Sequence, residues 1–127
     1  MSTRFNAKRG LVLVHARIWG PSGRRAVRLA LDTGATTTVI NAAILVDVGY
    51  DPGSAPSRVR MTTGSGIEYV PRIKIERIRA LRSERTDFEV VCHTLPPTAS
   101  VDGLLGLDFL RDCRLTIDFR AGEVSLE

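Results

Sequence analysis

Long apolar runs are missing from this sequence of 127 residues. No stretch approaches the ~20 consecutive apolar residues that a membrane-spanning helix requires. Residues 1–9 also lack the apolar core and the small-residue cleavage site of a secretory signal peptide. The sequence therefore predicts a chain without a membrane segment, and it favours the cytoplasm as the compartment.

Cysteine and histidine are scarce. The chain has Cys92, Cys113, His15 and His93 and no others, which is too few for a disulfide framework. No Cys-x-x-Cys or His-x-x-x-His pair brings two of them to the spacing of metal ligands. We therefore expect no metal site, and we interpret both cysteines as buried free thiols.

Lysine is nearly absent, since the 18 basic residues comprise 16 Arg and 2 Lys. With 14 acidic residues the formal net charge is +4. Nucleic-acid binders usually gather such charge on one face or in one run. Here the arginines are scattered, and many alternate with apolar residues as on a solvated strand face. We therefore expect no nucleic-acid partner.

The remaining composition is that of a globular domain. Apolar residues make up 43% and charged residues 25% of the chain, which is too apolar for a disordered segment. The length fits one domain over residues 1–127 and leaves no room for two ordinary ones.

Short alternating segments dominate the chain, with Gly- and Pro-containing turns between them. A phase slip near residues 76–77 indicates a turn or bulge within one such stretch. Many short strands at regular spacing predict an all-β domain, either a closed barrel or a sandwich. The expected strands are 11–18, 26–31, 36–40, 58–63, 67–75, 77–81, 88–93, 115–119 and 123–126.

One or two short helices interrupt this pattern. Asn41 is a suitable N-cap for a helix through Val48, and Gly49 is a natural stop. Residues 107–112 can form one or two further helical turns. The Gly-Ser pair at 64–65 predicts a type II′ hairpin turn between two strands.

The segment most informative about function is Asp32-Thr33-Gly34-Ala35, which follows an apolar strand directly. A carboxylate at a strand end can be partly desolvated, and a second carboxylate nearby would split the titration of the pair. Small residues after it leave room for a ligand or a second backbone. The alternative interpretation is an ordinary turn in which Asp accepts local backbone hydrogen bonds.

A longer pattern resembles the retropepsin-like aspartic proteases. Residues 32–40 read Asp-Thr-Gly-Ala-Thr-Thr-Thr-Val-Ile, like the catalytic loop and following strand of that family. Residues 104–110 read Leu-Leu-Gly-Leu-Asp-Phe-Leu, like its apolar pair, glycine and short helix. The hairpin at 61–69 lies where the family places its flap. The resemblance covers residues 11–126 and is closest to the bacterial single-domain members.

This resemblance implies a closed all-β barrel with a flap hairpin and aspartic endopeptidase activity. Only one Asp-Thr-Gly is present, so it implies a homodimer in which each chain contributes one Asp32. The two carboxyls would activate a water molecule that attacks an extended peptide or protein substrate, and no cofactor would be needed.

The resemblance also assigns roles to the residues around Asp32. Thr33 would brace the two loops across the dimer, and Gly34 would accept the substrate backbone. The supporting residues that it implies are Ala35 in the catalytic loop, Thr63, Gly64, Ser65 and Gly66 in the flap, and Leu104, Leu105 and Gly106 beneath the loop. Two alternatives stay open: the flap as an ordinary exposed hairpin, and the protein as a catalytically silent dimeric peptide-binding module of the same fold.

Overall fold

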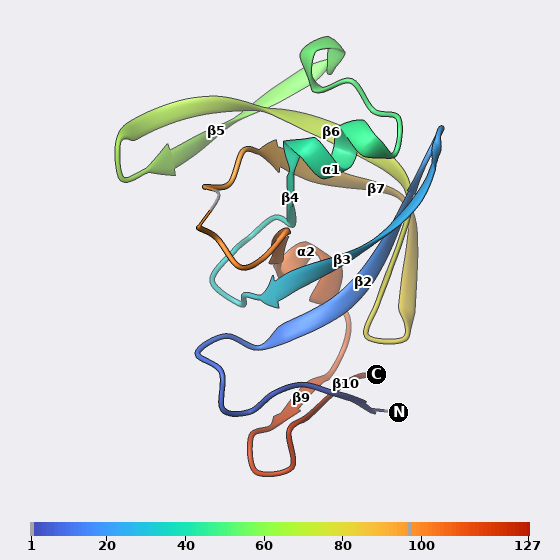
Figure 1. Ribbon diagram of the computed structural model, residues 1–127, viewed down its shortest axis with the longest axis vertical. Helices are drawn as coiled ribbons and strands as arrows, with labels where there is room; N and C mark the ends of the chain where they lie inside the picture. Colours follow the sequence, from blue (N-terminus) through green and yellow to red (C-terminus); the bar gives the residue numbers. More distant parts are fainter. Residues whose placement is uncertain (1, 97) are drawn as a thin grey trace.

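The computed structural model describes residues 2–96 and 98–127 (Figure 1). Within them it contains ten strands, two short α-helices and one 3-10 turn. These are β1 (Ser2–Arg4), β2 (Leu13–Gly20), β3 (Gly23–Leu31), β4 (Val39–Asn41), α1 (Ala42–Asp47), η1 (Pro52–Ser54), β5 (Ser57–Thr63), β6 (Gly66–Ala80), β7 (Ser83–His93), β8 (Gly103–Leu105), α2 (Leu107–Leu110), β9 (Leu115–Asp118) and β10 (Glu123–Leu126). Neither helix in this part of the chain has the length and apolarity needed to cross a bilayer.

Six strands close into a barrel. Their order is β2, β3, β8, β4, β7 and β6, and pairing of β6 with β2 completes the ring. Strand β5 pairs with the part of β6 that β2 does not reach, so the β5–β6 hairpin projects from the barrel (Figure 1). The predicted all-β class, with a closed barrel and a projecting hairpin, is confirmed.

Alternation along β2 shows how the barrel interior is filled. Val14, Ala16 and Ile18 are buried, whereas His15 and Arg17 are exposed. Successive side chains of a strand point to opposite faces, so one set enters the core and the other covers the outer surface. Other large residues of the same core that are fully buried, from the barrel strands and from the helices that pack on them, are Phe109, Leu29, Ile40, Leu45, Ile75, Ile78, Leu105, Val90 and Val48.

The long strand β6 changes phase midway, as its sequence predicts. Ile75 and Ile78 are both buried, so the in-out alternation slips between them. The register with β7 is the same on both sides of the slip, so no residue is inserted and the expected bulge is absent. The ladder is interrupted at the facing residues Glu76 and Asp87, and Asp87 has a φ of 49°.

Tyr50 packs at the point along β6 where the neighbouring strand changes from β5 to β2. Its hydroxyl accepts a hydrogen bond from Glu76 N at 2.7 Å and donates one to Trp19 O at 2.7 Å. Burial raises the pKa of the Tyr50 phenol above its usual value; the negative charge of Glu76 adds to this, and the hydrogen bond from Glu76 N opposes it. A side chain thus replaces the strand neighbour that this part of β6 lacks.

The β6–β7 hairpin was only half predicted. Strand β7 begins at Ser83, five residues before the expected start at residue 88. The two turn residues Leu81 and Arg82 have φ values of 52° and 61°, as in a type I′ turn. Such turns favour Asn-Gly, so this pair carries no sequence signal, and Leu81 is held there by its burial.

The other turns and helices follow the sequence with two corrections. Helix α1 is capped as predicted, with Asn41 Oδ1 accepting from Ala43 N at 3.3 Å, and Gly49 follows it with a φ of 102°. Helix α2 ends at Leu110 rather than at residue 112. The predicted type II′ turn is wrong, because the positive φ of the β5–β6 turn, 129°, falls on Gly66 and not on Gly64.

A small second sheet joins the two ends of the chain below the barrel (Figure 1). Its order is β1, β10 and β9. The β9–β10 hairpin was predicted, but β1 was not, because three residues show no alternation. Phe5 anchors the segment after β1: its N–H donates to Gly122 O at 2.9 Å, and its ring packs edge-on against Phe119 at 5.6 Å.

Candidate active site

The Asp-Thr-Gly segment lies in a loop that crosses the end of β8. Strand β3 ends at Leu31 and β4 begins at Val39. Both pair with β8, β3 in parallel and β4 antiparallel. The loop of residues 32–38 therefore leaves the sheet on one side of β8 and returns on the other, which places Asp32 directly after a buried strand, as predicted.

One hydrogen bond to the side chain and one from the backbone hold Asp32 in place. Its Oδ1 accepts from Gly34 N at 2.8 Å, and its backbone N–H donates to Leu105 O at 3.0 Å. The side chain is half-buried. Its second oxygen, Oδ2, accepts no hydrogen bond from the described residues, so that oxygen remains available to a ligand. Thr33 and Gly34 are exposed beside it.

Residues 104–107 lie against the loop. Besides the bond from Asp32, Leu107 N donates to Ala35 O at 2.8 Å. Leu105 is fully buried, Leu104 is half-buried, and Gly106 is buried. A Cβ on Gly106 would lie 2.8 Å from Ala35 O, so only glycine allows this approach. The structure therefore brings the two predicted motifs together.

Thr38 and Asp108 connect the two motifs by hydrogen bonds that the sequence does not predict. The hydroxyl of Thr38 donates to Asp108 Oδ1 at 2.7 Å and accepts from Gly106 N at 3.1 Å. The Asp108 carboxylate also accepts from Thr38 N at 3.0 Å and from Phe109 N at 2.9 Å. Thr38 is the one fully buried polar residue in the described part of the chain. The available signal was an acid in the first turn of α2, a position that favours negative charge.

An open cleft of about 530 Å³ extends from Asp32 along the hairpin stem. Its apolar wall is Val39, Val59, Met61, Val91 and Leu104, which pack together with Val70 as a small cluster outside the barrel core. The polar and small residues of the lining are Asp32, Gly34, Ala35, Thr36, Thr37, Arg60, Thr62 and Arg72.

The predicted flap residues lie at the end of the β5–β6 hairpin. Thr63 ends β5, and its side chain lies outside what the structure describes; Gly66 pairs with Thr63 and begins β6. Gly64 and Ser65 form the exposed turn between them. The stem of β5 lines the cleft, but Gly64, Ser65 and Gly66 do not. The tip projects from the barrel on the same side as the Asp32 loop (Figure 1).

The cysteines are both free, as predicted. Cys92 is buried, and burial raises the pKa of its thiol, an effect that the positive charge of Arg58 partly opposes. Cys113 is only partly buried, which corrects the expectation, and its Sγ lies 3.6 Å from Arg85 Nη2. Across residues 2–96 and 98–127, no three His, Cys, Asp or Glu side chains gather in a way that could hold a metal ion.

Two comparisons with known proteins each match an aspartic protease. A family model described as gag-polyprotein putative aspartyl protease matches residues 22–112. Among solved structures, the chain is similar to a retropepsin-like aspartic protease from Rickettsia conorii, with a TM-score of 0.72 and 16% sequence identity over 99% of this chain and 89% of that chain. The structural likeness bears on the fold alone. No curated protein matched the chain.

Proposed function

The chain belongs to the gag-polyprotein aspartyl protease family, and on that premise we propose that it is an aspartic endopeptidase active as a homodimer. Residues 1–127 would form one domain carrying half of the site, and each protomer would contribute one Asp32. The observation that carries the proposal is the position of Asp32, which lines the cleft with one carboxylate oxygen held by Gly34 N and the other without a donor in the described residues.

The chemistry needs two carboxyls that share one proton. Two carboxyls placed close together cannot both ionise easily, because their negative charges repel. The pair therefore loses its protons in two separate steps. The ionised carboxylate takes a proton from water, and the protonated one donates to the scissile carbonyl oxygen. A chain with a single Asp-Thr-Gly supplies one of these groups, and a two-fold axis through the site supplies the other.

The remaining residues of the site would position this pair and the substrate. Thr33 is exposed beside Asp32 and would bond across the dimer axis, and Gly34 would accept the substrate backbone. The hairpin tip at 63–66 would close over the peptide and exclude water. Leu104, Leu105 and Gly106 would support the loop from below, which agrees with the Asp32 N to Leu105 O bond.

The cleft supports an extended peptide with apolar side chains as the substrate. Its wall of Val59, Met61 and Leu104 offers apolar surface, and the edges of a hairpin and a loop offer backbone groups to a strand-like ligand. We therefore propose that the preferred cleavage sites have apolar residues next to the scissile bond.

The test is hydrolysis of an unfolded protein substrate between pH 3 and 8. We expect cleavage in the wild type and a loss of at least about 10²-fold in Asp32→Asn. A matched control is Asp112→Asn, because Asp112 is exposed, lies outside the cleft, and has a φ of 64° that Asn tolerates. Rates should fall at both ends of the pH range, because the pair works with one proton.

The same experiment decides the alternative function. If wild type and Asp32→Asn are equally inert but both bind peptide, the protein is a dimeric peptide-binding module without turnover. Equal cleavage by wild type and Asp32→Asn would remove Asp32 from the catalytic role.

A further inference from the structure

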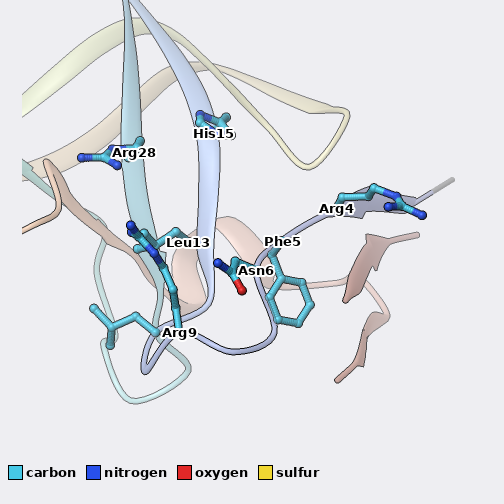
Figure 2. A pocket seen from close by; sticks show the side chains of 8 residues that line it. Arg4, Phe5, Asn6, Arg9, Leu13, His15 and Arg28 are labelled. Atoms are coloured by element: carbon cyan, nitrogen blue, oxygen red, sulfur yellow. The ribbon is translucent and has the colours of Figure 1, made fainter. Parts of the chain in front are cut away.

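The outer face of the β2–β3 hairpin carries cations beside a cavity outside the catalytic cleft. This cavity, of about 360 Å³, is lined by Arg4, Arg9, His15 and Arg28 together with apolar and amide groups. In Figure 2, Arg9 reaches from the N-terminal loop toward the strands that carry Leu13 and Arg28, whereas Arg4 points away at the far end. No acidic residue is part of the lining.

The cationic surface continues along β2. A second cavity of about 450 Å³ shares His15 with the first and is also lined by Arg17 and Arg79. We call the residues Arg9, His15, Arg17, Arg28 and Arg79 the β2 basic face. All five are exposed, and none forms an ion pair in the described part of the chain.

The strand register places these basic residues opposite one another. Arg17 of β2 is the cross-strand partner of Arg79 of β6, and His15 of β2 is the partner of Arg28 of β3. Two arginines directly opposite destabilise an antiparallel pair. The fold therefore carries an unfavourable charge arrangement that an anionic ligand would relieve.

Asp102 and Glu84 lie beside this face, but neither forms an ion pair with its residues in the described part of the chain. Asp102 Oδ2 accepts from the backbone N–H of Arg28 at 2.8 Å, so its carboxylate is engaged with the main chain. Glu84 is the partner of Arg79 on β7, but its Oε1 lies 3.2 Å from Nε of Arg77, with which it forms an ion pair.

The loop that carries Arg9 is ordered by its own hydrogen bonds. Asn6 Oδ1 accepts from Lys8 N at 3.0 Å, and Asn6 O accepts from Arg9 N at 3.2 Å. Phe5 N, one residue earlier, donates to Gly122 O at 2.9 Å. Arg9 is thus held beside the hairpin from a fixed turn, which lowers the entropy lost when a ligand binds.

We propose that the β2 basic face binds an acidic polypeptide segment in extended conformation. Guanidinium groups match carboxylates with paired N–H donors. Alternate residues of a strand lie about 7 Å apart, so His15 and Arg17 are spaced like acidic side chains at every second position of an extended peptide.

The lining favours a peptide over a single-stranded nucleic acid. Proteins that bind single strands stack bases on exposed aromatic rings. Phe5 is the one Phe, Tyr or Trp among the described residues of the two cavities, and its ring already packs edge-on against Phe119. The apolar side chains of Leu11 and Leu13 instead offer contact to the aliphatic parts of a peptide.

The face lies one strand away from the catalytic loop. Val12, between the lining residues Leu11 and Leu13, accepts at its carbonyl oxygen from Leu31 N at 2.9 Å, and Asp32 follows Leu31. We assign the β2 basic face the role of a second substrate-binding surface, which selects proteins with an acidic segment near the cleavage site. This role rests on the proposed function.

The test measures binding separately from catalysis, in the Asp32→Asn variant. The probe is a fluorescein-labelled twelve-residue peptide with Glu at every second position, and its Gln analogue is the uncharged reference. At low salt we expect the Glu peptide to bind at least about tenfold more tightly than the Gln peptide. The double variant Arg17→Glu/Arg28→Glu should abolish this difference.

A matched control separates a local site from general attraction to a basic protein. Arg58→Glu/Arg111→Glu makes the same change in net charge at two exposed arginines that line neither cavity. It should alter the affinity by less than about threefold. Thermal unfolding checks that both double variants are folded. If Arg17→Glu/Arg28→Glu does not fold, the single variants Arg17→Gln and Arg28→Gln are measured in its place.

Three outcomes would overturn the proposal. They are no preference for the Glu peptide, an equal loss in the control variant, or tighter binding of a single-stranded oligothymidylate of the same net charge. In the active chain, attaching the Glu segment to a cleavable peptide should lower KM with little change in kcat. An inactive chain that still binds the Glu peptide would refute the proposed function and leave the binding surface intact.

Discussion

Asp108 links the candidate catalytic loop to helix α2. It accepts hydrogen bonds from the backbone and hydroxyl of Thr38 and from Phe109 N. Thr38 in turn accepts from Gly106 N at 3.1 Å. Because Thr38 is fully buried, water cannot replace a lost partner, and the Asp108 carboxylate adds to the backbone bonds that position the loop.

Replacing Asp108 should therefore destabilise the protein in a graded way. Asp108→Ala leaves two buried donors of Thr38 without an acceptor and should cost about 3 kcal/mol of unfolding free energy. Asp108→Asn keeps one acceptor oxygen and should cost about 1 kcal/mol. Urea unfolding at pH 7 measures both, and equal losses in the two variants would contradict the assigned role.

Tyr50 gives a prediction about alkaline pH. Burial raises the pKa of its phenol, so the folded state keeps this proton to a higher pH than the unfolded chain does. The protonated Tyr50 phenol therefore contributes its full share of the unfolding free energy below pH of about 10. This contribution is lost as pH rises through the pKa of Tyr50 in the folded state.

Tyr50→Phe should lower the unfolding free energy by about 1–2 kcal/mol at pH 7, because it removes the bonds to Glu76 N and Trp19 O. The difference in unfolding free energy between wild type and Tyr50→Phe should become smaller above pH of about 10. Unfolding followed by circular dichroism at several pH values checks this, and a gap that widens with pH would refute the explanation.

At the scale of elements, the loop of residues 32–38 and the β8–α2 segment function as one unit. They meet at Gly106, whose missing side chain allows backbone atoms of Ala35 and Thr37 to approach where a Cβ would lie 2.8 Å from each. Contacts with backbone cannot move aside as a flexible side chain can, so this junction is intolerant of added volume.

Gly106→Ala should accordingly cost about 1–3 kcal/mol of stability and should lower proteolytic activity by displacing Asp32. Gly10→Ala is the matched control, because a Cβ there would meet no atom within 4 Å. Thermal unfolding and the hydrolysis assay measure the two effects. A Gly106→Ala protein as stable and active as the control would show that the junction is not tightly packed.

The elements also show where pattern reading succeeds and fails. The β2–β3 hairpin and the cap of α1 were predicted because alternation, Gly-Pro turns and Asn41 are local signals. The β6–β7 turn was missed because Leu81 and Arg82 adopt positive φ values that their residue types disfavour, and Leu81 is buried there. Strand β1 was missed because its pairing with β10, at the other end of the chain, decides it.

At the scale of the whole molecule, the proposed activity belongs to a dimer and not to a chain. Below the dimer dissociation constant, the rate of hydrolysis should rise with the square of the enzyme concentration, because each active site needs two chains. Initial rates over a hundredfold range of protein concentration test this. A rate strictly proportional to concentration at all dilutions, with a monomer in sedimentation, would remove the shared site.

Mixing variants gives an independent test. Added Asp32→Asn chains should form mixed dimers that hold one ionisable Asp32 and lack the shared proton. At a fixed amount of wild type, an excess of Asp32→Asn should therefore suppress activity in proportion to the share of mixed dimers. The same excess of an unrelated basic protein is the control, and unchanged activity would show that each chain works alone.

The sequence by itself determined the class of fold and the location of Asp32, the candidate catalytic acid. Alternation of apolar residues specifies strands, and Asp-Thr-Gly after an apolar strand specifies a carboxylate at a strand end, because both depend on neighbours within a few positions. Only the tertiary structure decided which residues surround that acid and which basic residues face one another on the outer side of β2. The Thr38–Asp108 bonds, the approach at Gly106 and the facing of Arg17 with Arg79 join residues dozens of positions apart. Such contacts follow from closure of the barrel, which no local pattern encodes.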